Sequence, residues 1–466
     1  MPPVRADASD DVLHQVLTEH LATFLDECDE AGVRVPRAAR RELVDYLACG
    51  KAEHGFALLR CSGCGAARTV AFSCKRRGFC PSCGGRRMCA TAAHLVDHVF
   101  PAVPVRQWVL SLPMPLRFRL CWDGELCREV LSILLSSVFD FYREASGVPD
   151  ARCGSVTLRQ LFGSSLNANL HFHALVVDGV FAAEGTGFHP VAPPSTADVQ
   201  RVVNAVRDRV ERLLVRRGLA GNEGNSRDED EDDAANAFLE ASMAGRAALG
   251  TRAGAIPRWM RERAVRKLPP RCAAAEFYNL HAGVGIAAGD KSGLERLCRY
   301  VLRPPLARSR LTWTEHGNLR LRFKRPWDDG TDGLLMTPSQ FLARLVAIIP
   351  PPRRNLIHYH GVFAPAAPGR SAIVPGRRGA QDSTRPVLLP PSASPKWLMR
   401  PTWIPWASLL HRVFGLDAFV CTNCGTRMTV HAVVQGVWAT TRVLASLARP
   451  SRQQRLVCAR GPPAAP

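Results

Sequence analysis

Two closely spaced cysteine pairs constrain this sequence more than any other feature. Cys61 and Cys64 bracket Ser-Gly, Cys80 and Cys83 bracket Pro-Ser, and 15 residues separate the pairs. A CxxC segment turns the backbone tightly enough to present two thiolates to one ion, and two such turns complete a tetrahedron. The spacing therefore predicts a structural Zn²⁺ held by these four cysteines. Four thiolates leave no open coordination position, so we do not expect this zinc to be catalytic.

Other cysteines leave the ligand set open. The chain has 16 cysteines, and without an export signal we expect zinc binding rather than a disulfide framework. Cys421 and Cys424 resemble half of a zinc ribbon; no second CxxC follows them, and His431 is a candidate partner. Three more cysteines lie near the first two pairs and are alternative ligands, or ligands of a second ion: Cys49, Cys74 and Cys89.

The charge balance points to a polyanionic partner. Lys plus Arg number 61 against 41 Asp plus Glu, a net charge of +20, and nucleic acid is the commonest partner of such a chain. A basic surface kept for solubility is the alternative. A hydrophobic content of 46% argues against global disorder. No uncharged apolar run of about 18 residues occurs, so we expect no membrane span and no membrane partner. We expect a cytoplasmic protein of a bacterial cell that is associated with the nucleoid.

A histidine pair marks the most informative segment, residues 167–181. The apolar runs around Asp178-Gly179 predict a hairpin, with a strand over residues 169–177. Side chains alternate along a strand, so Asn169, His171 and His173 share one face. Two imidazoles two residues apart can hold one divalent ion, with Asn169 as a third ligand or as a residue that orients a ligand. The alternative is a solvated polar face.

One of the five tyrosines stands in a distinctive context. Tyr300 lies at the edge of an apolar stripe with helical spacing, and Asp290 or Ser292 is placed to cap that helix. Pro304 and Pro305 should end it. A phenol on a helix beside guanidinium groups is well placed to meet a phosphodiester, although most such tyrosines simply pack their helix. The apolar stripe consists of Leu294, Leu297, Cys298 and Val301. The opposite, basic face consists of Arg296, Arg299 and Arg303.

Taken together, these segments resemble the rolling-circle insertion-sequence transposases, a branch of the HUH single-stranded-DNA endonuclease superfamily. In that family a bulky apolar residue, here Phe172, separates the two metal-binding histidines. The resemblance spans roughly residues 45–430. It rests on FSCKRRGFCPSCGGRRM (72–88), VRQWVLSLP (105–113), the histidine strand ending in DGVF (178–181), RYVLRPPLA (299–307), HYHGVFAP (358–365) and CTNCGTRM (421–428).

The resemblance implies an activity and its residues. His171 and His173 would hold Mg²⁺ or Mn²⁺, and Tyr300 would attack single-stranded DNA at transposon ends to form a 5′-phosphotyrosyl link. The positions four before and four after Tyr300 are Arg296 and Pro304, which is similar to the single-tyrosine branch. A homo-oligomer is compatible with this. Contacts to DNA are expected from Arg76, Arg77, Arg86, Arg87, Arg296, Arg299 and Arg303.

The implied fold class is α+β: an HUH-type central antiparallel sheet with packed helices, preceded by a small zinc-binding domain. An acidic stretch, residues 221–233, is expected as an inserted solvated loop. The expected segments are an N-terminal helical segment (1–48) that opens with an amphipathic helix over 11–28, the zinc-binding domain (49–100), the catalytic domain (101–363), a Pro/Gly/Arg-rich linker (364–400) and a C-terminal segment (401–466).

Three alternatives stay open. A replication initiator or a relaxase would use the same chemistry for another purpose. A non-catalytic zinc-containing DNA-binding protein would need neither Tyr300 nor a metal at the histidine pair. A degenerate transposase copy would have lost its activity.

Overall fold

The computed structural model describes residues 11–184, 186–219, 233–249, 253–254, 269–324, 326, 330–375, 404–415 and 417–448. The chain divides into two compact units. We call Met1–Gln15, Glu42–Arg76 and Ile404–Pro466 the ribbon unit, and Val16–Arg41 and Arg77–Trp403 the sheet unit. Each unit is described by itself below.

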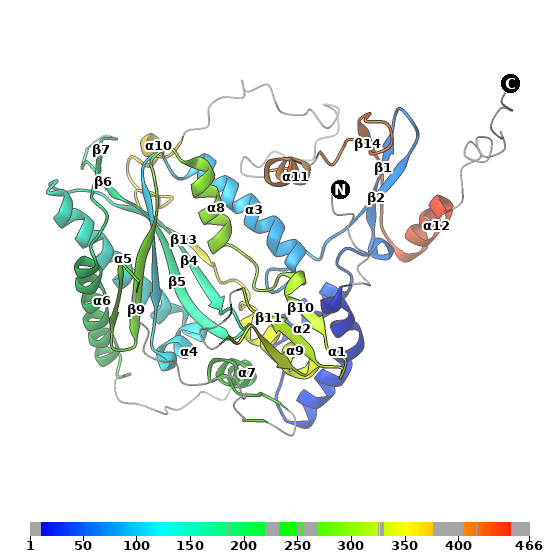
Figure 1. Ribbon diagram of the computed structural model, residues 1–466, viewed down its shortest axis with the longest axis horizontal. Coiled ribbons are helices and arrows are strands. Elements are labelled where there is room, and N and C mark those ends of the chain that lie inside the picture. The colour runs from blue at the N-terminus through cyan, green and yellow to red at the C-terminus, as the bar shows by residue number, and fades with distance from the viewer. Residues whose placement is uncertain are drawn as a thin grey trace. The chain divides into compact units, whose positions relative to one another are not determined.

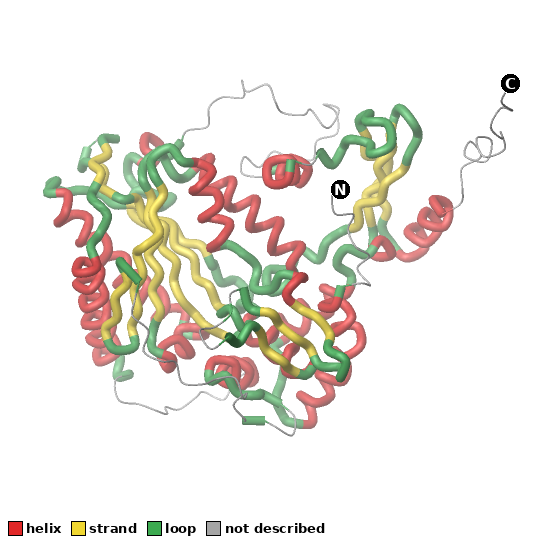
Figure 2. Tube along the Cα trace, viewed as in Figure 1, coloured by secondary structure: helices red, strands yellow, loops and turns green. Residues whose placement is uncertain are grey.

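A six-stranded antiparallel sheet forms the centre of the sheet unit (Figures 1 and 2). The expected central antiparallel sheet is therefore present, and the protein is α+β. In spatial order the strands are β13 (Ile357–Gly361), β4 (Gly154–Phe162), β5 (Ala168–Val177), β3 (Val105–Ser111), β9 (Tyr278–Ile286) and β8 (Cys272–Ala275).

Helices cover both faces of this sheet (Figure 1). On one face, α5 (Gly124–Ser146) and α6 (Thr196–Arg216) bury a core with Leu170 and Phe172 of β5. On the other face, α3 (Pro81–His98) and α8 (Lys291–Val301) bury Leu175 and Val177 of the same strand. The odd-numbered residues of β5 thus face α3 and α8, which places His171 and His173 on that side.

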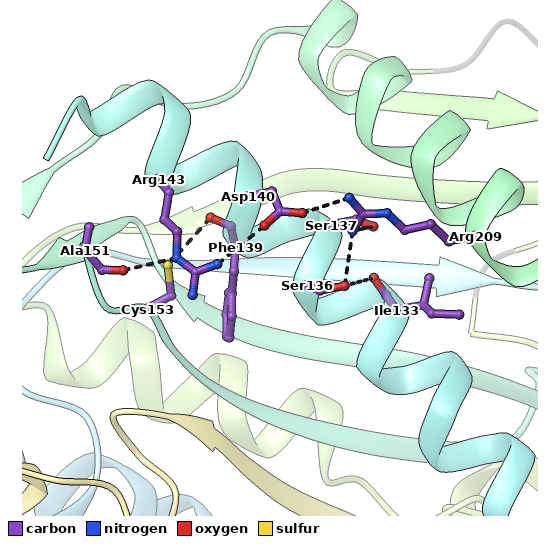
Figure 3. Close-up of polar contacts among 9 residues, drawn as sticks. All are labelled: Ile133, Ser136, Ser137, Phe139, Asp140, Arg143, Ala151, Cys153 and Arg209. Atoms are coloured by element: carbon purple, nitrogen blue, oxygen red, sulfur yellow. Dashed lines mark hydrogen bonds and ion pairs between the residues drawn. The ribbon is translucent and has the colours of Figure 1, made fainter. Parts of the chain in front are cut away.

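Helices α5 and α6 are also joined by polar contacts at their surface (Figure 3). Arg209 of α6 donates to Asp140 of α5 at 2.9 Å and to the hydroxyl groups of Ser136 and Ser137 at 3.2 Å each. Arg143 donates to the carbonyl oxygen of Ala151, just before β4.

The predicted hairpin at Asp178-Gly179 is wrong. β6 (Gly179–Phe181) does not pair with β5 but with β7 (Phe188–Pro190). Asp178 is buried instead, where its carboxylate accepts from Arg106 at 2.6 Å and from the Tyr142 hydroxyl at 2.7 Å. Gly179 is needed for close packing, because a Cβ atom there would lie 2.4 Å from the carbonyl oxygen of His189.

The remaining elements complete the two units. Helix α1 confirms the expected opening helix, and α8 confirms the tyrosine helix, with Asp290 as its N-cap. The elements are α1 (Val12–Glu30), α2 (Arg37–Leu47), η2 (Ala52–His54), β1 (Phe56–Cys61), β2 (Ala67–Ala71), α4 (Met114–Trp122), α7 (Asp233–Met243), η3 (Arg308–Arg310), β10 (Leu311–Trp313), β11 (Leu319–Arg322), β12 (Gly333–Met336), α9 (Pro338–Ile348), α10 (Arg370–Ile373), α11 (Trp406–Phe414), β14 (Met428–Val434) and α12 (Val437–Ala448).

The ribbon unit is built from both ends of the chain. Strand β1 pairs with β2 on one side and with the C-terminal β14 on the other, both antiparallel. The five expected segments therefore do not coincide with the two units, because β14 of the expected C-terminal segment completes a sheet that begins at residue 56. The acidic stretch up to residue 232 and linker residues 376–400 lie outside the described residues. Among the helices described, none is long and apolar enough to span a membrane.

Candidate functional site

The two histidines of β5 lie side by side on the face that α8 covers. Their ring centroids are 4.8 Å apart, and His173 is 4% exposed. Burial lowers the pKa of both imidazoles, that of His173 well below its usual value. Both rings are therefore neutral at physiological pH, which is the form that binds metal.

Each histidine uses its Nδ1 atom for a hydrogen bond within the sheet. His171 Nδ1 donates to the backbone oxygen of Asn169 at 2.8 Å, which leaves the Nε2 lone pair available. His173 Nδ1 lies 2.7 Å from the side-chain amide of Gln107 on β3, and the amide oxygen, after a half-turn of that group, would accept Nδ1–H. His173 Nε2 is buried without a partner among the residues that the structure describes. This arrangement fits a divalent ion held by the two Nε2 atoms.

The third ligand remains a prediction. The side-chain oxygen of Asn169 accepts a hydrogen bond from the Arg117 guanidinium at 2.8 Å, so this oxygen is already bonded to a positively charged side chain. His281 of β9 lies on the same face as His173, since both are in register with Val109 of β3. Gln107 and His281 were not predicted from the sequence, because only the strand register places them on the same face as His173.

Tyr300 lies next to the histidine pair. Its side chain is 51% exposed, and its ring centroid is 6.5 Å from that of His173, with the two rings perpendicular. The guanidinium carbon of Arg303 lies 4.3 Å from the centre of the phenol ring, and Lys324 Nζ lies 5.9 Å from it. The site thus combines an exposed phenol, two cations and a pair of neutral imidazoles, which can meet a phosphodiester.

The other arginines expected to bind DNA are in diverse environments. Arg76 pairs with Asp45 in the ribbon unit. Arg86 is exposed on α3, and Arg296 is exposed on α8, where it donates to Ser292. Arg299 is half-buried near the Cys89 thiol, whose pKa is raised mainly by burial. Arg77, Arg87 and Arg303 line one cavity in the sheet unit.

A four-cysteine group lies in the ribbon unit. The sulfur atoms of Cys61, Cys64, Cys421 and Cys424 all lie within 4.8 Å of one another, which suits one tetrahedral zinc. The expected grouping of Cys61 and Cys64 with Cys80 and Cys83 is therefore wrong. His431 is not a member of the group either.

The two cysteine pairs of this group adopt matching turns. Gly65 follows the first pair with φ +70°, and Gly425 follows the second with φ +73°. Each of these glycines donates its N–H to the carbonyl oxygen of the first cysteine of its pair, at 3.0 and 2.9 Å. Gly63 lets the turns approach closely, because a Cβ atom there would meet Thr426 Oγ1 at 2.6 Å.

Cys80 and Cys83 belong to the sheet unit and begin a helix. Cys80 is the N-cap of α3, and its sulfur accepts from the backbone N–H of Cys83. Pro81 at the first helical position favours this helix start. In the ribbon unit the backbone N–H of Cys74 donates to Cys49 Sγ at 3.4 Å. The N-terminal part of the chain thus carries a cysteine cluster consistent with a zinc-binding domain.

Two family models match the chain. Residues 16–112 match a family described as "Transposase zinc-binding domain", and residues 154–371 match one described as "Putative transposase". The second match contains both histidines and Tyr300. No curated protein matches the chain, and no solved structure does. The two matches and the four-cysteine group support a transposase with structural Zn²⁺.

Proposed function

We propose that this transposase cuts and rejoins single-stranded DNA through a covalent bond to Tyr300. The observation that carries the proposal is the proximity of an exposed phenol to the histidine pair, with its ring centroid 6.5 Å from that of the buried His173. Both imidazoles are fixed through Nδ1 by hydrogen bonds. A structural tyrosine would not need cations and metal-binding nitrogens around it.

In this mechanism the Tyr300 oxygen attacks the scissile phosphorus in line. The bond from phosphorus to the 3′ oxygen breaks, the phenol proton is lost, and the departing 3′ oxygen gains a proton, so a 5′-phosphotyrosyl ester remains. A Mg²⁺ or Mn²⁺ ion bound by His171 and His173 would polarise the phosphate. Arg303 and Lys324 lie beside the phenol ring and supply positive charge where negative charge develops.

Rejoining reverses these bond changes. A 3′ hydroxyl attacks the phosphotyrosyl ester and releases Tyr300. Because the ester conserves the free energy of the cleaved phosphodiester bond, rejoining needs no ATP. Arg296 and Pro304 stand one helical turn from Tyr300, and neither can act as a second nucleophilic phenol. Transfer of both DNA ends therefore requires reuse of Tyr300, a second protomer or a host enzyme.

The test is a search for a protein–DNA adduct that survives denaturation. The purified chain is incubated with Mn²⁺ or Mg²⁺ and labelled single strands that tile the DNA on both sides of its gene. We expect an adduct with the wild-type chain and none with Tyr300→Phe, His171→Ala or His173→Ala. Tyr359→Phe is the matched control, because Tyr359 lies on the edge strand β13, and it should retain the adduct.

The alternatives predict different outcomes. Tight binding without an adduct on any strand would favour a non-catalytic zinc-containing DNA-binding protein or an inactive copy. An adduct that persists in Tyr300→Phe would assign the nucleophile to another residue. Cleavage at a replication or transfer origin, rather than at element ends, would favour an initiator or a relaxase.

A further inference from the structure

The sheet unit contains a cavity that the mechanism above does not use. Its volume is about 240 Å³, and it lies between strand β4, the first half of α3 and residues 301–305 just after Tyr300. A cavity of about 150 Å³ is large enough to bind benzene. The space beside Tyr300 can therefore accept a flat ring system of one or two rings.

The residues that line the cavity include apolar side chains and two residues, Arg159 and Gln160, with buried polar atoms that have no hydrogen-bond partner among the described residues. Leu158 and Val301 contribute apolar side chains. Gln160 is 4% exposed, and its amide nitrogen donates to the backbone oxygen of Val301 at 3.4 Å. Its amide oxygen is buried with no hydrogen-bond partner among the described residues. A buried acceptor in this state requires a donor from water or from a ligand.

Strand register connects this cavity to the histidine pair. Gln160 is in register with His171, and Leu158 with His173, so all four side chains share one face of the sheet. The cavity and the candidate metal ligands are therefore neighbours on the surface that α8 covers.

Positive charge accompanies the cavity. Arg77 and Arg87 are exposed and line it, and Arg303 lines it while also contacting the Tyr300 ring. Guanidinium groups beside an apolar slot suit a nucleotide, whose base is flat and whose two flanking phosphates are anionic.

We propose that this cavity holds one unstacked base of the bound single strand, next to the phosphate that meets Tyr300. The proposal rests on the proposed function for the identity of the strand. The base packs against Leu158 and Val301, and one of its N–H groups donates to the Gln160 amide oxygen. The flanking phosphates contact Arg77, Arg87 and Arg303, so the occupied cavity fixes which phosphate lies at Tyr300.

The experiment measures binding rather than cleavage. In the full chain carrying Tyr300→Phe, which leaves the strand intact, Kd is measured for the tightest of the tiling strands and for versions with one abasic nucleotide at each position. We expect one abasic position to weaken binding about tenfold, the usual scale for losing one bound base. Thr91 of α3 lines the cavity, and Thr91→Phe should fill it.

With Thr91→Phe, the intact strand should bind about tenfold more weakly. The abasic strand should bind this variant with the same Kd as it binds the protein with Thr91. That unchanged Kd also shows that the variant is folded. Thr91→Ser leaves the cavity open and should keep the full abasic penalty. Gln160→Leu keeps the volume and should reduce the preference for one base at that position.

The proposal would be overturned if no abasic position weakened binding, or if Thr91→Phe kept the same abasic penalty. Absence of binding to every single strand would overturn it as well. Failure of the adduct assay with a normal abasic penalty would contradict the tyrosine mechanism and leave the base cavity supported, so the two proposals fail separately.

Discussion

At the scale of single residues, the site depends on which atom of each histidine is already hydrogen-bonded. The sequence predicted the His171 and His173 pair from alternation along one strand. It could not predict Gln107, because the contact joins β3 to β5 across 66 residues and depends on strand register. A residue that orients a metal ligand is brought to it by strand register, so it cannot be recognised in the sequence near the ligands. The ligands themselves form a local sequence pattern.

Gln107→Leu should weaken Mn²⁺ binding at the histidine pair by roughly 10- to 100-fold, since it removes the group that orients His173. Free Mn²⁺, followed by electron paramagnetic resonance during titration, measures this affinity. Gln107→Glu should restore binding, because a carboxylate accepts Nδ1–H. Gln200→Leu on α6 is the control and should bind Mn²⁺ normally. Normal affinity in Gln107→Leu would argue against a metal at His173.

Lys324 gives the site a pH dependence. Partial desolvation, with Arg303 and Arg310 nearby, lowers the pKa of Lys324 to about 8. The ammonium is charged below this pH and loses its charge above it, so affinity for single-stranded DNA should fall as the pH rises through about 8.

Lys324→Met should abolish this fall, and the slope of log K against log salt should become shallower by about 1. Fluorescence anisotropy at a series of pH and salt values measures both. Lys291→Met, at the exposed start of α8, should keep the wild-type fall with pH. A fall that survives in Lys324→Met would assign the pH dependence to another group.

At the scale of elements, local patterns predicted the strand β5 and the helix α8 well. Alternation and an Asp cap are properties of neighbouring residues, and both are seen in the structure. The hairpin at Asp178 failed for a non-local reason. Its carboxylate is bound by Arg106, 72 residues away, and by Tyr142, so it stabilises the buried junction between the sheet and α5 rather than a turn.

The pairing of α5 with α6 should depend on apolar packing far more than on the ion pair in Figure 3. Leu134 is fully buried between sheet and helices, so Leu134→Ala should lower the free energy of unfolding by about 2–5 kcal/mol. Asp140 and Arg209 are both more than a third exposed, so Asp140→Ala should cost less than about 1 kcal/mol. Urea denaturation followed by circular dichroism measures both, and equal losses would contradict this ranking.

At the scale of the whole molecule, the zinc group shows why spacing alone misassigned the ligands. Cys64 and Cys421 are 357 residues apart, and the antiparallel pairing of β1 with β14 brings them together. The CxxCG pattern does not distinguish the pairs, because it occurs at 61–65, 80–84 and 421–425. Nearness in sequence favoured Cys80 and Cys83, but these residues lie at the start of α3 in the sheet unit, and their sulfur atoms are not grouped with those of Cys61 and Cys64.

Because one ion requires cysteines from both ends of the chain, the C-terminal segment should be necessary for full zinc content. Cys421→Ser combined with Cys424→Ser should lower bound zinc by one ion per chain, measured by elemental analysis of the purified protein. Cys61→Ser with Cys64→Ser should lose the same single ion, and the four substitutions together should lose no more than that. Cys28→Ser, a buried cysteine of α1, is the control and should keep the wild-type content. A loss of two ions in the fourfold variant would mean that the two cysteine pairs bind separate metal ions. The association of β1 with β14 would then depend on strand pairing alone.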